Sequence, residues 1–297
     1  MKTDNDGSIG SIYTCSSSGC TPITETSKTY FNSIASGISC IINDNNNCKK
    51  GEANESYYDN YSKRVINCSA SKCLPSSVTG YYIDYGTYPS LMNYLITCIN
   101  NSCTTEPHSG TEVEFYLDGL DKTSQPIIYF DGKFSKIPGN VSGVYLDSET
   151  KSGSNLIVCE STTKCVSLSY NEGIFLNAAN LLDKTKSSEQ LIVCSSTGCI
   201  GKKISSTDTT NHANYFVDGL TKKLIQCSGN TDVSCEIVMN NISNKYYLDY
   251  ATPSSSCSMG NSFCRANVIY CNNSSRCVSS LITSESYFID GDSAVNI

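Results

Sequence analysis

The sequence predicts an all-β protein in which two- to three-stranded hairpin or meander repeats stack into an elongated β-solenoid. Two short phrases carry this prediction because they alternate along the chain. The first is an apolar run into a cysteine, with a second cysteine a few polar residues later, as in LIVCESTTKC (156–165) and LIVCSSTGC (191–199). The second is an aromatic phrase such as YYLD, which starts at Tyr246. Such self-similarity is typical of repeat proteins, whose small units bury a core only by stacking on neighbours.

The two phrases divide the chain into one array of repeats. A polar leader at 1–10 precedes about nine units, which we place at 11–37, 38–64, 65–94, 95–126, 127–154, 155–189, 190–222, 223–266 and 267–297. No signal peptide opens the chain, and no apolar run is long enough to cross a membrane. We therefore expect a segment of a longer secreted polypeptide.

The 18 cysteines fall into local pairs, which predicts disulfides and an oxidising, extracellular environment. Zinc is the alternative, but there is no CxxC, and His108 and His212 have no ligand-like spacing to any cysteine. Cysteines five residues apart would face each other across a hairpin, and each bridge would contribute about 2 kcal/mol. The expected bridges are Cys15–Cys20, Cys40–Cys48, Cys68–Cys73, Cys98–Cys103, Cys159–Cys165, Cys194–Cys199, Cys227–Cys235, Cys257–Cys264 and Cys271–Cys277.

The residues around the cysteines predict strands. The position two before the first cysteine is Ile in eight of nine repeats, whereas the next position varies freely, which is the period-two pattern of a half-buried strand. In the aromatic phrase the second residue is aromatic and the fourth is usually Asp, often followed by a turn-forming Gly. Each repeat therefore reads as a meander of three strands. A closed β-propeller is the alternative, but its four-stranded blades need about 40 residues, more than most repeats supply.

The aromatic column has two interpretations. In the first, the aromatic residues stack on one another inside the core. In the second, they line one face and contact a partner, since tyrosine supplies rigid amphipathic contact area. The partner-binding residues on the second interpretation are Tyr58, Tyr82, Tyr116, Tyr145 and Tyr247.

No catalytic, cofactor or metal motif is present, so we expect a protein that is not an enzyme. We interpret His108 and His212 as solvated loop residues, Glu112 and Glu114 as a solvated strand edge, and 43–47 as the long turn of the Cys40–Cys48 hairpin. The net charge of −7, with 21 scattered Lys and Arg, argues against nucleic acid or an anionic membrane as partner. N-glycans are permitted by eight sequons, at Asn54, Asn60, Asn67, Asn100, Asn140, Asn241, Asn272 and Asn273.

The alternating LIxC-x4-C and GYYLD-like phrases, in an acidic chain rich in Asn, Ser and Tyr, resemble the scaffoldins of anaerobic gut fungi. The resemblance covers residues 11–291 and rests on repeat texture. It implies non-catalytic, cohesin-like repeats of a cellulosome that capture dockerin modules of plant-cell-wall hydrolases. The alternatives are a structural stalk or adhesin segment, and a carbohydrate-binding array that uses exposed tyrosines.

Overall fold

A computed structural model describes most of the chain. The described residues are 12–23, 28–31, 40–44, 47–49, 51–70, 72–86, 91–110, 113–120, 127–137, 142–149, 155–161, 164–182, 189–205, 213–251, 267–284, 286–289 and 291. Between residues 23 and 49 only the backbone is described. The chain divides into two compact units, Met1–Gly139 with Thr163–Cys165, and Asn140–Thr162 with Val166–Ile297.

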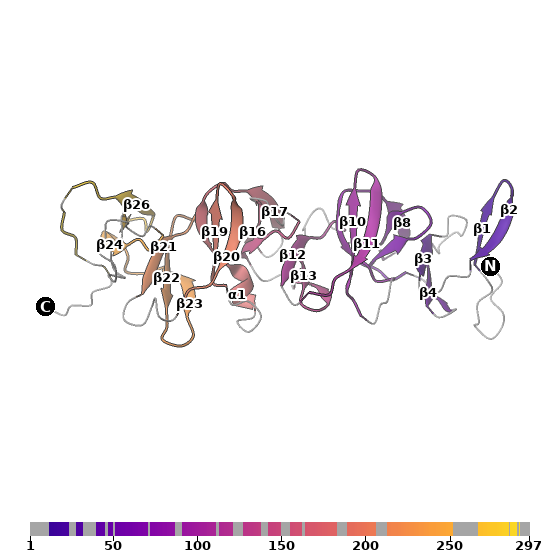
Figure 1. Cartoon of the computed structure of the whole chain (residues 1–297), viewed down its shortest axis with the longest axis horizontal. Coiled ribbons are helices and arrows are strands. Elements are labelled where there is room, and N and C mark those ends of the chain that lie inside the picture. The colour runs from indigo at the N-terminus through magenta and orange to yellow at the C-terminus, as the bar shows by residue number, and fades with distance from the viewer. Residues whose placement is uncertain are drawn as a thin grey trace. The chain divides into compact units, whose positions relative to one another are not determined.

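The described part of the first unit is built only from strands (Figure 1). The hairpin nearest the N-terminus is β1 (Ile12–Ser16) with β2 (Gly19–Ile23). A six-stranded sheet of order β5-β4-β3-β6-β7-β8 follows, with β3 (Lys28–Phe31), β4 (Cys40–Asp44), β5 (Asn47–Lys49), β6 (Ser56–Asp59), β7 (Arg64–Cys68) and β8 (Cys73–Ser76). Two three-stranded sheets complete it, with β9 (Gly80–Ile83), β10 (Tyr94–Ile99) and β11 (Ser102–Pro107), then β12 (Glu114–Leu117), β13 (Ile127–Phe130) and β14 (Phe134–Lys136).

Three-stranded sheets also make up the second part of the chain. Their strands are β15 (Gly143–Leu146), β16 (Asn155–Ser161), β17 (Lys164–Ser169), β18 (Gly173–Leu176), β19 (Leu191–Ser195), β20 (Gly198–Lys202), β21 (Asn214–Val217), β22 (Leu224–Ser228), β23 (Ser234–Ile237), β24 (Lys245–Leu248), β25 (Asn267–Cys271) and β26 (Cys277–Leu281). One short helix, α1 (Ala178–Leu182), occurs among the described residues. The all-β class and the small antiparallel sheets predicted from the sequence are therefore confirmed.

Seven meanders pair the aromatic phrase with the strand that leads into the first cysteine, or into Phe130 in the meander of β12 to β14. The aromatic second residue of the first strand lies opposite the Ile two before the cysteine, as in Tyr82↔Ile96 and Phe175↔Ile192. This Ile is 0% exposed in seven meanders, at Ile66, Ile96, Ile128, Ile157, Ile192, Ile225 and Ile269. The inward-facing position read from the period-two pattern is confirmed.

The disulfides hold the second and third strands together, as predicted. Cys98 lies directly opposite Cys103 in the register, and their Cα atoms are 4.0 Å apart. Six bridges join near neighbours in this way, namely Cys15–Cys20, Cys68–Cys73, Cys98–Cys103, Cys194–Cys199, Cys227–Cys235 and Cys271–Cys277. Cys159 and Cys165 are also disulfide-bonded, whereas Cys257 and Cys264 lie outside the described residues.

Backbone hydrogen bonds connect consecutive meanders within each unit. The residue after the fourth position of one aromatic phrase donates its N–H to a first-strand carbonyl of the preceding meander. Gly119 donates to Tyr81 at 2.8 Å in the first unit, and Tyr250 donates to Tyr215 at 3.0 Å in the second. The bridges that accompany these bonds are parallel, since the first strands of successive meanders run in the same direction.

A second backbone link uses residues with positive φ in the turn between the first two strands. The carbonyl of Lys63 accepts a hydrogen bond from the N–H of Cys103, at 3.0 Å, and that of Lys222 accepts one from Cys277 at 2.7 Å. Lys63 and Lys222 have φ of 56° and 57°, which turns their carbonyl groups toward the next meander. These meanders are therefore tied to their successors at both the first and the third strand.

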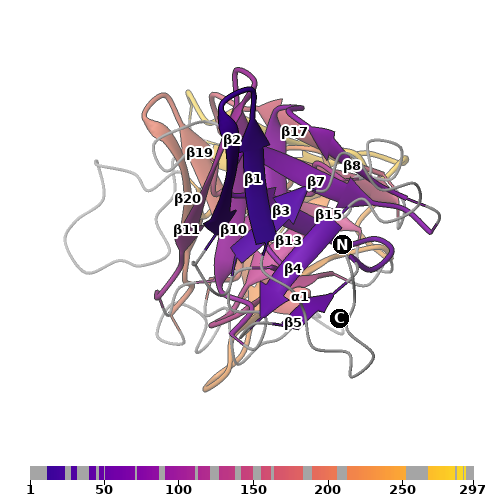
Figure 2. The same ribbon diagram turned by 90° about the vertical axis from the view of Figure 1, so that its right-hand side faces the viewer.

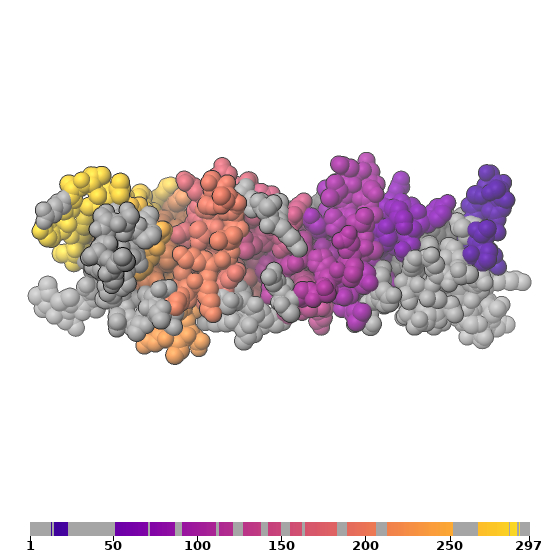
Figure 3. Space-filling view, in the orientation of Figure 1, coloured from indigo at the N-terminus to yellow at the C-terminus, as the bar shows by residue number. Residues whose placement is uncertain are grey.

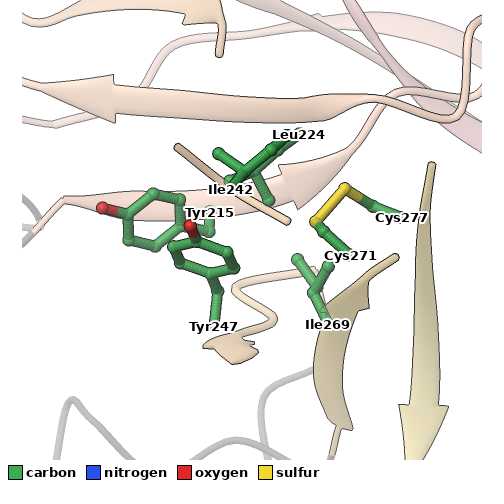
Figure 4. Packing of buried hydrophobic residues seen from close by; sticks show 7 residues of the cluster. All are labelled: Tyr215, Leu224, Ile242, Tyr247, Ile269, Cys271 and Cys277. Atoms are coloured by element: carbon green, nitrogen blue, oxygen red, sulfur yellow. A yellow bond between two sulfur atoms is a disulfide. The ribbon is translucent and has the colours of Figure 1, made fainter. Parts of the chain in front are cut away.

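Hydrophobic contacts follow the same order. In the second unit Tyr215 and Leu224 of one meander pack with Tyr247, Ile269 and the Cys271–Cys277 bridge of the next (Figure 4). The colours of this unit in the space-filling view follow the sequence from rose through orange to yellow, in agreement with neighbour-to-neighbour packing (Figure 3). The core is therefore shared between meanders and not closed within one.

Two predictions of register are wrong. Tyr57 and not Tyr58 lies opposite Ile66, so SYYD at Ser56–Asp59 is the aromatic phrase, and a one-residue slip reverses which side chain faces inward. In the hairpin of β4 and β5, Cys48 lies opposite Asn43 and not opposite Cys40, because β4 extends to Asp44, which pairs with Asn47, so the expected turn at 43–47 is partly strand.

The structural repeat also begins earlier than the boundaries set from the cysteine phrase. A boundary at 94/95 separates β9 from most of β10 and from β11, although the three form one sheet. The meander therefore runs from the aromatic phrase through both cysteines.

Candidate functional site

The five tyrosines predicted to contact a partner lie in the core. Tyr58, Tyr82, Tyr116, Tyr145 and Tyr247 are 7%, 0%, 4%, 0% and 4% exposed. Tyr116 packs against Tyr81 of the preceding meander with ring centroids 4.9 Å apart, and Tyr247 packs against Tyr215 at 4.7 Å. Because buried rings offer no face to a partner, these five residues are core residues. Four of them belong to the stacked column, whereas Tyr58 is the third residue of its phrase and lies opposite Val65.

Burial changes the acid–base behaviour of this column. Loss of hydration, with a smaller effect from the charge of Asp118, raises the pKa of Tyr82 to about 12. Burial raises the pKa of Tyr145 further still. These phenols stay neutral over the whole physiological range, as structural side chains should.

The fourth residue of each aromatic phrase forms a second buried column. One carboxylate oxygen of Asp84 accepts a hydrogen bond from the N–H of Gly86 at 2.9 Å, and Asp118 accepts one from Leu120 at 2.9 Å. This closes the turn after the first strand. All members are 5% exposed or less, namely Asp59, Asp84, Asp118, Asp147, Asn177, Asp218 and Asp249. The sequence predicted the turn but not the burial of these residues. The recurrence of Asp or Asn at the fourth position of the aromatic phrase was the signal that could have predicted it.

The second oxygen of these carboxylates is also occupied. In Asp84 it accepts a hydrogen bond from the hydroxyl of Thr105 at 3.0 Å, and Thr105 stands two residues after the second cysteine. Serines at the corresponding position supply the donor for Asp147 and Asp249, whereas turn residues supply it for Asp59 and Asp218. A buried carboxylate without donors would be costly, so each aspartate has a local partner.

In two meanders the buried fourth residue has a different kind of partner. Lys136 lies 2.7 Å from Asp118 Oδ2 as an ion pair, with side chains 29% and 1% exposed. In the meander of β18 to β20 the residue two after the second cysteine is Gly201, which has no donor side chain. There the fourth residue is Asn177, whose amide donates to the carbonyl of Glu189 at 2.9 Å. The column is therefore structural, with its polar groups directed to the protein itself.

The cysteine-free meander of β12 to β14 replaces its disulfide with aromatic packing. Phe130 and Phe134 occupy the cysteine positions, directly opposite each other in the register, with ring centroids 4.8 Å apart. His108 covers them at 4.9 Å from Phe134, and its Nδ1 lies 3.1 Å from the carboxylate of Glu114, which also accepts the Tyr116 hydroxyl.

The predictions of solvated roles for His108 and Glu114 are therefore wrong. Both side chains are about four-fifths buried, at 21% and 18% exposed, because the missing disulfide leaves an aromatic surface to cover. Glu112 and His212 lie outside the described residues. The contacts of His108 and Glu114 explain packing, and they do not form a catalytic arrangement.

The outward faces of some sheets carry exposed side chains that are available for binding. We define the outer row of a meander as three residues in register across the sheet: the first residue of the aromatic phrase, the residue before the first cysteine, and the residue after the second cysteine. Two of these rows are mainly apolar. In the meander of β18 to β20 the row is Ile174, Val193 and Ile200. In the meander of β24 to β26 it is Tyr246, Tyr270 and Val278. Ile200, Tyr270 and Val278 are 67%, 37% and 57% exposed. In the sequence, the variable position before the first cysteine was the signal for this outward-facing row.

In the row between these two, the exposed side chains are polar, whereas its first member, Tyr215, is buried. Tyr215 aligns with Gln226 and Glu236 in the meander between the two apolar rows. The third strand beside each row is also the edge of its sheet among the described residues. A sheet edge presents backbone groups to which an extended segment of a partner can bind. Outer row and edge strand together form the candidate interaction surface.

The described sequons vary in accessibility. Asn100 and Asn241 lie in exposed turns with positive φ, and Asn54, Asn272 and Asn273 are exposed as well. Asn60 and Asn67 are partly buried, and Asn140 lies outside the described residues. The exposed sequons can carry a glycan without disturbing the core.

Within the described part of the chain, no group of three His, Cys, Asp or Glu side chains is placed to hold a metal ion. No helix in the same residues has the length and apolar character needed to span a bilayer. No family model matches the chain, and no curated protein or solved structure is significantly similar to it. The disulfides define the class of the protein as a disulfide-stabilised β repeat protein of an oxidising environment.

Proposed function

We propose that the chain is a non-catalytic, secreted scaffold whose repeats dock the dockerin-type modules of plant-cell-wall-degrading enzymes. The observation that carries the docking role is the recurrence of one surface, an outer row beside an edge strand, on successive meanders. The resemblance of the repeat texture to scaffoldins supplies the identity of the partner. Both core columns are occupied by internal contacts, so the exposed members of the outer rows, such as Ile200 and Val278, are side chains that can vary without affecting the fold.

Multivalency gives such a scaffold its affinity. One outer row of three side chains is a small contact area, and a single docking event would be weak. Linked sites raise the effective concentration for the second event, so a partner with several modules binds far more tightly than one module does. The alternation of apolar rows, as at Ile200 and Val278, with polar rows, as at Glu236, would give neighbouring repeats different partners.

We propose an open stack of meanders, a β-solenoid, as the arrangement that presents these rows. The links between consecutive meanders within each unit support it, since each meander contacts its neighbours in sequence order. A closed β-propeller is the alternative. Small-angle X-ray scattering distinguishes the two, because a rod has a much larger maximum dimension than a ring of equal mass.

Retention of dockerin-bearing hydrolases on the immobilised chain tests the docking role. We expect capture by the wild type and clear loss of capture by the double variant Ile200→Asp with Val278→Asp, since charges on the outer rows oppose burial. Leu181→Asp on α1 is the matched control, because Leu181 is exposed at 54% but lies outside any outer row.

The other outcomes identify the alternatives. Equal retention of hydrolases by the wild type and the double variant would show that the outer rows are not the docking surface. No retention of any hydrolase, with binding of the chain itself to cellulose or xylan, would support the carbohydrate-binding array. Binding to neither hydrolases nor polysaccharides would favour a structural stalk or adhesin segment.

A further inference from the structure

In the described part of the chain, the meander of β12 to β14 is the only one without a cysteine. Its middle strand, β13, can be found by its label in Figure 2. Disulfides join the second and third strands elsewhere, as Cys98–Cys103 does. This meander instead holds the pair of Asp118, directly after its first strand, and Lys136, the last residue of its third strand. A close contact between strands therefore exists where the disulfide is missing.

The two side chains of this pair meet at close range and away from most solvent. Lys136 Nζ lies 2.7 Å from Oδ2 of Asp118, and the Asp118 side chain is 1% exposed. No group among the described residues donates a hydrogen bond to this oxygen, so the contact with Nζ lies outside hydrogen-bond geometry. The other carboxylate oxygen, Oδ1, accepts the N–H of Leu120 at 2.9 Å. The carboxyl group is therefore held in place with an amine nitrogen in contact.

A second carboxyl group, that of Glu55, lies near the same amine. Lys136 Nζ donates a hydrogen bond to the carbonyl of Asn54 at 3.4 Å, and Glu55 is the next residue. The charges of Glu55 and Asp118 both act on Tyr85, so the two carboxyl groups lie near one ring. Burial raises the pKa of Glu55 above its ordinary value, by more than the charge of Lys136 lowers it. A carboxyl group with a raised pKa holds a proton more readily, which suits it to carry one between neighbours.

We propose that Lys136 and Asp118 condense to form an isopeptide bond, with Glu55 carrying protons between them. Nζ attacks Cγ of Asp118, the bond from Nζ to Cγ forms, and the bond from Cγ to Oδ2 breaks. The ammonium group keeps one hydrogen on the new amide, and its other two hydrogens leave with Oδ2 as water. Glu55 takes protons from the amine, passes them to the departing oxygen and ends unchanged. The reaction needs no oxidant, metal ion or second reactant.

The fold supplies what this reaction lacks between separate molecules. In water, condensation of an ammonium group with a carboxylate is unfavourable because both ions are strongly hydrated. Groups held in contact by one fold react at an effective concentration that can reach about 10⁵–10⁸ M, and the buried pair has already lost most of its hydration. The bond links the first and third strands of a meander that has no disulfide. It does not depend on what the outer rows bind.

The mass of the whole chain after reduction of its disulfides tests the proposal. The wild type should weigh one water molecule less than its sequence, and trypsin should leave Lys136 uncleaved in a branched peptide that also contains Asp118. Lys136→Arg keeps the positive charge beside Asp118 but has no amine that can attack, so this variant should have the full mass. Lys133→Arg, at an exposed lysine of the same hairpin, is the matched control and should lose water like the wild type.

A second pair of variants tests the proton carrier. Glu55→Gln should have the full mass, whereas Glu52→Gln, at a neighbouring exposed carboxylate, should still lose water. Loss of water from Glu55→Gln at the wild-type level would overturn the role of Glu55.

The wild-type mass and the branched peptide decide whether the bond exists, even where a variant does not fold. A wild type of full mass would overturn the proposal. So would a loss of water that persists in Lys136→Arg, because it would indicate a succinimide at Asp118-Gly119 instead of a bond to Lys136.

Discussion

Gly219 lies directly against the ring of Phe175 in the preceding meander. A Cβ at Gly219 would be 2.6 Å from Cε1 of Phe175 and 3.3 Å from the carbonyl oxygen of Ile174, to which the Gly219 N–H donates. Gly119 stands in the same relationship to Tyr82, with 2.5 Å left for a Cβ. The Asp-Gly of the aromatic phrase is therefore a contact between repeats as well as a turn.

Gly219→Ala should destabilise the second unit by about 1–3 kcal/mol, the usual cost of overpacking a buried site. The ring of Phe175 is fully buried and the Ile174 carbonyl is part of the backbone link, so neither can move freely. Urea unfolding of the variant measures the loss. Phe175→Leu should cost stability by itself but reduce the further cost of Gly219→Ala, and strictly additive costs would contradict the contact.

Lys136→Met should leave the carboxylate of Asp118 buried without its counter-charge. Removing one partner of a buried pair typically costs about 3–5 kcal/mol, and the partial exposure of Lys136 places the expected loss at the lower end. Lys133→Met removes an exposed lysine of the same hairpin and should leave stability unchanged. Equal effects of the two substitutions on the urea midpoint would show that the ion pair does not stabilise the meander.

The loss of stability on removal of a disulfide should depend on whether the disulfide is buried. Cys98→Ser with Cys103→Ser should cost about 2 kcal/mol or more, because loop entropy and two buried side chains are lost together. Cys15→Ser with Cys20→Ser alters exposed residues of the β1–β2 hairpin and should leave the main unfolding transition in place. A similar shift of the midpoint in both variants would contradict this dependence on burial.

The period-two pattern made the strands and the local bridges predictable, because the Ile and the first cysteine recur at fixed separation. It could not decide between Tyr57 and Tyr58, since two adjacent tyrosines satisfy an aromatic position equally well. Only the pairing with Ile66 settles which ring faces inward. The expected opposition of Cys40 and Cys48 is wrong for a similar reason, because the cysteine spacing does not reveal that β4 continues to Asp44.

The buried aspartates and His108 show a different limit. The burial of Asp84 depends on a hydroxyl donor from Thr105, which is 21 residues away and meets it only after the meander forms. The burial of His108 depends on two phenylalanines that stand where other repeats have a disulfide. Neither residue of such a contact carries a sequence pattern that predicts the contact. Residue type alone therefore predicted a solvated turn or loop for these side chains.

Alkaline pH should unfold the protein through its tyrosine column. Burial raises the pKa of Tyr82 and of Tyr85 to about 12, and negative charges, of Asp118 for both and of Glu55 for Tyr85, act in the same direction. A tyrosine in the unfolded chain releases its proton at about pH 10. Between these values the folded state holds more protons than the unfolded state, so the free energy of unfolding falls as pH rises, and below about pH 10 it does not change through these groups.

Tyrosinate absorbance and circular dichroism, followed together during an alkaline titration, measure this effect. We expect exposed tyrosines to ionise first and the core tyrosines to ionise only as the β signal is lost. Tyr82→Phe should lose the hydrogen bond from the Tyr82 hydroxyl to the Val78 carbonyl (2.9 Å) and be less stable at neutral pH, yet lose less of its remaining stability above pH 10. Tyr61→Phe, at an exposed turn, should leave that pH dependence unchanged. Complete ionisation of the tyrosines with the β signal intact would contradict the buried column.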